Sequence, residues 1–178
     1  MSTITDFFLN NGTDYKGRSL LDMLNMTDHE FEASHDVIQF LFPLHEKSYH
    51  SLTAPIMMAE DVAILSESVD AQKRLLDALF RFEDFLGIDS LSETFDQKKV
   101  IWWCHAGNHN LLRITRIIRC LRLFGLEKWA KKFYNTIVKV SQGNGLSEVT
   151  HGFWKRALEE PVLESMTQEF LKQRRIEL

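Results

Sequence analysis

The chain has 178 residues, of which 44% are apolar, and its 13 Phe and 4 Trp suffice for one sizeable hydrophobic core. A formal net charge of −4, from 21 Lys and Arg against 25 Asp and Glu, excludes a global attraction to nucleic acid or an anionic membrane. No run approaches the roughly 20 apolar residues of a membrane span, and the N-terminus lacks a secretory signal, so we expect a cytoplasmic protein without a transmembrane segment.

The low proline content and the hydrophobic pattern favour helices. Only three prolines occur, and no stretch alternates apolar and polar residues as a half-buried strand does. We therefore predict an all-α fold, in which about six to eight helices form one orthogonal or antiparallel bundle. One domain is expected to span residues 1–178, because no linker or low-complexity tract divides the chain.

Two helical segments are predicted near the N-terminus, the first of them short. The first runs from Ser19 to Asn25 and places leucines on one side. Next, Thr27 and Glu30 form a capping box, in which each side chain accepts a hydrogen bond from the other residue's backbone N–H. We expect one helix from there to Pro43, with Phe31 among the residues on its apolar stripe.

The middle of the chain alternates loops with helices. Residues 43–55 are a loop rich in Ser, Thr, His and Pro, and 59–65 has the pattern of a short helix. A longer helix starts at Ser68 or Asp70 and continues to Gly87. Residues 88–98 are polar and predicted to be irregular, whereas 101–105 fits either a helical turn or a buried extended piece.

The C-terminal third is predicted to be helical throughout. Helices over 108–124 and 126–142 are separated only by Gly125, which indicates an antiparallel hairpin. Further helices are expected over 147–178, one of about 147–158 and a last one that begins at Pro161.

A basic cluster marks the 108–124 helix, where arginines recur every three residues. Arg113 falls at the edge of the apolar arc, so it is predicted to be at least partly buried, with His109 and Arg116 on the same side. A buried guanidinium keeps its proton and therefore needs a counter-ion. Two sources remain open: a bound carboxylate or phosphate, or an internal acid, for which the candidates are Glu32, Asp36 and Glu46.

A polar border on the 28–42 segment is of suitable length to meet this cluster. It carries His35, Asp36 and Gln39. These three residues, with His109, Arg113 and Arg116, are the candidate ligand-binding site. A histidine beside a carboxylate can act as general acid and base, but no nucleophile motif accompanies the pair, and we assign no catalytic residue.

Other common sites have no signature here. The seven histidines are scattered without a zinc spacing, and no Walker, dinucleotide or nucleophile-elbow motif occurs, so we expect no metal and no cofactor. Cys104 and Cys120 lie outside any CxxC motif and suit reduced, buried thiols. The lysines at 128, 131 and 132 fit a solvated helix face, so nucleic acid is not an expected partner.

Two segments resemble the conserved domain of the opioid growth factor receptor family. His109–Ile117, followed by Gly125–Glu127, is similar to its most recognisable segment, and His35–Pro43 is similar to a second signature. The approach through Gly17–Arg18 also fits, and the resemblance covers roughly residues 8–140. The chain departs from the pattern at two positions, Val37 and Phe40, where Tyr and Trp are usual.

The resemblance implies a helical, receptor-like binding domain. The family is named for a vertebrate receptor of the pentapeptide Met-enkephalin that is associated with the nuclear envelope and growth inhibition, and the chain resembles its microbial single-domain relatives. We expect a non-catalytic, signalling-related protein that binds a peptide or small anionic ligand. The alternatives are an enzyme that uses His35 or His109 as acid or base on an anionic substrate, and a protein-interaction module anchored by exposed tryptophans.

Overall fold

The computed structural model describes residues 2–47 and 54–162. Ten α-helices lie within these residues: α1 Thr3–Leu9, α2 Leu20–Leu24, α3 Asp28–Ala33, α4 His35–Leu41, α5 Ala59–Glu67, α6 Val69–Leu86, α7 Gln97–Trp103, α8 Asn110–Leu123, α9 Glu127–Ser141 and α10 Glu148–Glu159.

One small hairpin interrupts the helices. Strands β1, Ile88–Asp89, and β2, Thr94–Phe95, pair antiparallel, so that Ile88 faces Phe95 and Asp89 faces Thr94. The hairpin occupies part of the polar segment predicted to be irregular. It is too short to alter the fold class, and the predicted all-α architecture is confirmed.

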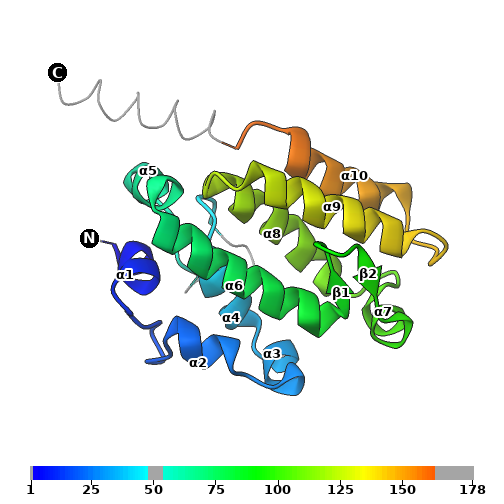
Figure 1. Ribbon diagram of the computed structural model, residues 1–178, viewed down its shortest axis with the longest axis horizontal. Helices are drawn as coiled ribbons and strands as arrows, with labels where there is room; N and C mark the ends of the chain where they lie inside the picture. Colours follow the sequence, from blue (N-terminus) through cyan, green and yellow to red (C-terminus); the bar gives the residue numbers. More distant parts are fainter. Residues whose placement is uncertain (1, 48–53, 163–178) are drawn as a thin grey trace.

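The helices pack as three groups around α6. In Figure 1, α8, α9 and α10 lie together on one side, and these three helices contact one another. Helices α1 and α5 pack on α6 from another direction, and the short helices α2, α3 and α4 complete the opposite side. The predicted antiparallel hairpin is formed by α8 and α9, which are separated at Gly125, a residue with positive φ.

A continuous apolar core joins these groups. It contains aromatic rings from many elements, and Phe31 of α3 lies against Phe82 and Phe85 of α6 at 6.3 and 5.3 Å between ring centroids. Trp103 and Trp154 are fully buried. Each indole N–H donates to a backbone carbonyl, which satisfies the polar atom that burial would otherwise penalise.

Helix α1 is not among the elements predicted from the sequence, although a local signal exists. Ser2 caps the helix by accepting from the backbone N–H of Thr5, and Ile4, Phe7 and Phe8 recur at helical spacing and are buried. Asp61 fixes α1 to α5, because its carboxylate accepts a hydrogen bond of 2.6 Å from the Thr5 hydroxyl.

The helix predicted from residue 28 to Pro43 is divided in two, and that part of the prediction was wrong. Ser34, with φ −100° and ψ 81°, ends α3 and precedes α4. A straight helix that buries Phe31 would turn Phe40 to the opposite side, at 100° per residue. Both rings are buried here, since the break at Ser34 reorients α4.

Residues 101–105, for which two states were possible, contain the end of a helix. Helix α7 begins at residue 97 after Asp96, whose side chain accepts from the N–H of Lys98. Trp103 is its last residue. The helix expected to begin at Pro161 lies almost entirely outside the described residues, as do positions 48–53 of the predicted loop.

The capping box of α3 provides a first stability prediction. The Thr27 hydroxyl accepts from the Glu30 N–H at 3.3 Å, and the Glu30 carboxylate accepts from the Thr27 N–H at 2.9 Å. We expect Thr27→Ala to lower the free energy of unfolding by about 1 kcal/mol, measured by chemical denaturation.

The matched control is Ser34→Ala. Ser34 precedes α4 but makes no side-chain capping bond, so its replacement is expected to change stability by less than about 0.5 kcal/mol. Equal losses in the two variants would contradict the role given to the Thr27 cap.

Candidate functional site

A cavity of about 820 Å³ is lined on one side by α8 and on the other by α4. Helices α4 and α8 supply most of its walls, and the segments before α2 and after α4 supply the rest. All six candidate residues line it: His35, Asp36, Gln39, His109, Arg113 and Arg116. Sequence reasoning therefore selected residues that the fold brings together, although the helical pattern gave no measure of the space between them.

The arginines of α8 recur every three residues, so each is turned by about 60° from the one before it. The apolar face of this helix buries Ile114, Ile117 and Ile118. Arg113, Arg116 and Arg119 all line the cavity. Arg122 lies elsewhere: it donates to the carbonyls of residues 157 and 160 and pairs with the Glu127 carboxylate at 3.1 Å.

Arg113 is neutralised inside the protein. Its side chain is 7% exposed, and Nη1 lies 3.1 Å from Oε2 of Glu32 and donates to Oδ1 of Asn110 at 2.9 Å. Nη2 donates to the Glu32 carbonyl at 3.2 Å. Burial lowers the pKa of Arg113, and the Glu32 charge opposes that shift. Of the acids considered from the sequence, Glu32 is the partner of this guanidinium.

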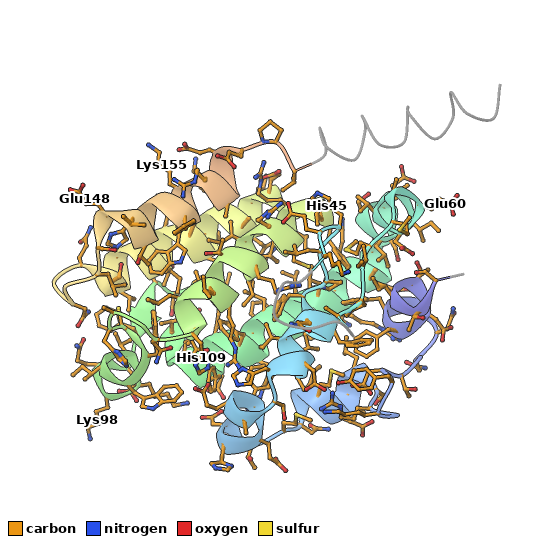
Figure 2. The ribbon with its side chains drawn as sticks, turned by 180° about the vertical axis from the view of Figure 1, so that it is seen from behind. His45, Glu60, Lys98, His109, Glu148 and Lys155 are labelled. Carbon is orange, nitrogen blue, oxygen red and sulfur yellow. The ribbon has the colours of Figure 1, made fainter. Side chains whose placement is uncertain are left out.

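Two histidines stand beside this ion pair. The rings of His35 and His109 meet edge to face at 5.2 Å, and Nε2 of His109 lies 2.9 Å from Oε1 of Glu32. Burial, together with the Arg113 charge, lowers the pKa of His109. Figure 2 shows His109 where α8 faces α3 and α4.

Asp36 belongs to a separate polar network at the rim. Its Oδ2 accepts from the Tyr15 hydroxyl at 2.7 Å and lies 2.7 Å from Nζ of Lys16 and 2.8 Å from Nη2 of Arg18. Burial opposes ionisation, but the hydrogen bonds from Lys16, Tyr15 and Arg18 outweigh it and hold the pKa of Asp36 well below its usual range. These three side chains neutralise and hydrogen-bond the carboxylate, and among the described residues it forms no ion pair with an arginine of α8.

Arg116 differs from its neighbours because the group that accepts its hydrogen bond is uncharged. Nη1 donates to the Phe42 carbonyl at 2.8 Å. Within residues 2–47 and 54–162, no carboxylate lies within 4 Å of its guanidinium. Burial lowers the pKa of Arg116, yet an arginine keeps its proton. The side chain is thus a half-buried cation that faces open space.

The cavity lining has an excess of positive charge. It carries five basic side chains, Lys16, Lys47, Arg113, Arg116 and Arg119, against two acidic ones, Asp36 and Glu46. The chain as a whole is acidic, so this excess is local. Sequence reasoning missed Arg119 as a lining residue, although its position three residues after Arg116 was a usable signal.

Other features of the surface bear on the alternatives. Of the four tryptophans considered as anchors, Trp103 and Trp154 are buried and Trp129 is partly buried, whereas Trp102 is 46% exposed beside Phe85 in a hollow of about 380 Å³. The described part of the chain also bears on two further classes of site. There, no three His, Cys, Asp or Glu side chains lie close enough together to hold a metal ion. No helix in that part is long and apolar enough to cross a membrane.

Comparison with known proteins agrees with the two sequence signatures. The Opioid growth factor receptor (OGFr) conserved region matches residues 9–160. Opioid growth factor receptor-like protein 1 of Rattus norvegicus is 28% identical over 127 residues, which cover 68% of this chain and 26% of that protein. The opioid growth factor receptor of Homo sapiens is 32% identical over 112 residues, or 58% of this chain and 16% of the receptor.

A relative from Xenopus tropicalis, opioid growth factor receptor-like protein 1, is 27% identical over 122 residues, covering 64% of this chain and 24% of its own length. The chain thus spans about a quarter or less of the curated relatives it matches. No solved structure gives a significant match.

Proposed function

Because the chain belongs to the opioid growth factor receptor conserved-region family, we propose that it is a non-catalytic binding domain whose cavity beside α8 takes an anionic ligand. The ligand carries a carboxylate or phosphate group, as a short peptide or a small metabolite does. The names of the relatives, receptor and receptor-like protein, accord with a binding role.

One observation carries the proposal, namely the Arg116 guanidinium. A charge in a low-dielectric surrounding is costly unless an opposite charge meets it. Arg113 has Glu32, but the described part of the chain offers Arg116 only a backbone carbonyl within hydrogen-bond distance. An incoming anion supplies the missing charge, and the planar guanidinium suits a two-oxygen acceptor such as carboxylate or phosphate.

The remainder of the lining supports a ligand with an apolar body. Ile38, Leu44 and Leu112 line the cavity, and Leu112 is 61% exposed although it is on the same helix as the arginines. Apolar walls with a few placed polar groups are typical of small-ligand sites. A peptide with an apolar last residue and a free carboxylate fits both features.

The binding prediction uses Arg116→Met. We expect this substitution to weaken the binding of an anionic probe by about tenfold to a hundredfold, since a hydrogen bond to a charged group contributes about 1.5–3 kcal/mol. Isothermal titration of the whole chain with inorganic phosphate, and separately with an apolar tripeptide bearing a free C-terminal carboxylate, measures the loss. The amidated tripeptide separates a carboxylate requirement from apolar binding.

The control is Arg74→Met, which removes an arginine from α6 outside the cavity lining and is expected to leave both affinities unchanged. Circular dichroism verifies that both variants fold. Equal affinities of the original chain and of Arg116→Met for both probes, or no binding of either probe, would refute the proposed site.

A further inference from the structure

Glu46 occupies a distinctive place in the cavity wall. It is one of two acidic side chains there, and the other, Asp36, is bound by Tyr15, Lys16 and Arg18 at the rim. The Glu46 carboxylate instead meets α8, where its two oxygens pair with the two terminal nitrogens of Arg119. The Nη1–Oε2 distance is 2.7 Å.

Arg119 and Arg116 are one helical turn apart and line the same cavity. The charge of Arg116 also acts on Glu46: hydrogen bonding to Arg119 lowers the pKa of Glu46 first of all, and the Arg116 charge contributes to the same shift. His45 is a further neighbour, with Nε2 3.8 Å from the same carboxylate. Glu46 therefore lies in the field of both guanidiniums.

The Glu46–Arg119 pair is weakly held. The Glu46 side chain is 51% exposed and the Arg119 side chain 25% exposed, so water competes for both groups. Exposed pairs contribute roughly 0–1 kcal/mol, and salt screens them further. A doubly charged anion that contacts Arg116 and Arg119 together offers a stronger electrostatic interaction than the single carboxylate.

We infer that Glu46 is a built-in competitor for the anion site: its carboxylate occupies the Arg119 half, and a phosphate dianion displaces it to bind Arg116 and Arg119 together. The inference rests on the proposed function and makes it more specific. It assigns Arg119 to the ligand site, and it names a phosphate or phosphate monoester, in preference to a monocarboxylate, as the group that benefits from displacement. No covalent step is involved.

The test titrates inorganic phosphate and acetate into the original chain and into Glu46→Gln at low ionic strength. Gln keeps the shape of Glu and removes the competing charge. We expect Glu46→Gln to bind phosphate about fivefold more tightly, with a smaller gain for acetate, because acetate carries one charge and engages one guanidinium. Adding Arg119→Met to Glu46→Gln is expected to abolish the gain.

The matched control is Glu127→Gln. Glu127 is also an exposed acid paired with an arginine of α8, Arg122, but neither residue lines the cavity. Its substitution is expected to leave phosphate affinity unchanged. A gain in Glu127→Gln equal to that in Glu46→Gln would overturn the inference, since net charge alone would then explain it.

Failure of the inference differs from failure of the proposed function. If phosphate binds and Arg116→Met weakens it, but Glu46→Gln binds no more tightly than the original chain, Glu46 is not a competitor and the anion site still stands. If phosphate and acetate bind neither the original chain nor Glu46→Gln, the inference is overturned. The tripeptide titration then decides the proposed function separately.

Discussion

Replacement of Glu32 by Ala is expected to lower the free energy of unfolding by about 3 kcal/mol, as measured by urea denaturation at pH 7. The substitution leaves Arg113, 7% exposed, without the carboxylate that faces its Nη1. Removal of one partner of a buried ion pair typically costs about 3–5 kcal/mol. The lower end applies because the Glu32 side chain is 26% exposed.

Two further variants separate this cost from a general effect of removing acids. The double variant Glu32→Ala with Arg113→Met is expected to recover most of the loss, because the orphaned charge is removed with its partner. Glu46→Ala breaks a pair that is exposed to solvent, and its expected cost is below about 1 kcal/mol. Similar losses for Glu32→Ala and Glu46→Ala would show that burial of Arg113 is not decisive.

A second large effect is expected at Glu83, a carboxyl group buried on α6. Its side chain is 3% exposed, and Oε2 receives only a long hydrogen bond of 3.4 Å from the Ser90 N–H. Among the described residues, Oε1 of Glu83 and the Ser90 hydroxyl lack hydrogen-bond partners. Burial raises the pKa of Glu83 to about 7.

The sign of the pH dependence follows from that raised pKa. Between the ordinary value of 4.5 and about 7, the folded chain holds more protons on Glu83 than the unfolded chain does. The contribution of Glu83 to the free energy of unfolding has its full value below pH 4.5 and is lost as the pH rises through 7. The total loss by pH 8 is about 3 kcal/mol, because a tenfold change in proton affinity corresponds to about 1.36 kcal/mol.

Glu83→Gln should therefore be more stable than the original chain by about 3 kcal/mol at pH 8, with little difference at pH 4.5. Denaturation midpoints measured across this pH range test the expectation. Asp77→Asn, an exposed change on the same helix, serves as the control and is expected to preserve the original profile. A constant difference between Glu83→Gln and the original chain at every pH would disprove the assignment.

Local sequence signals were sufficient where short-range interactions form the structure. The Thr27–Glu30 capping box lies within four residues, and Gly87, at φ 70°, ends α6 as expected of a residue that tolerates this conformation. The edge position of Arg113 on α8 follows from the 100° helical step, so its burial was predictable. The clustering of His109, Arg113 and Arg116 was predictable for the same reason.

The partners of those charges depend on segments distant in sequence. Glu32, Asp36 and Glu46 were equivalent candidates for Arg113 because nothing in the chain order ranks them. In the folded chain, Glu32 pairs with Arg113, Asp36 pairs with Lys16 and Arg18 before α2, and Glu46, after α4, pairs with Arg119. Among the described residues, Arg116 then has a backbone carbonyl, and no carboxylate, as its acceptor.

The sequence by itself determined the helical class and the face on which the candidate site residues lie, because helical periodicity and capping act within one or two turns. Its two signature segments indicated the family. Only the tertiary structure decided that α3 and α4 part at Ser34, which acid neutralises which arginine, and how much space remains beside Arg116. Charge pairing and cavity shape depend on how separate helices pack, and no local pattern encodes those distances.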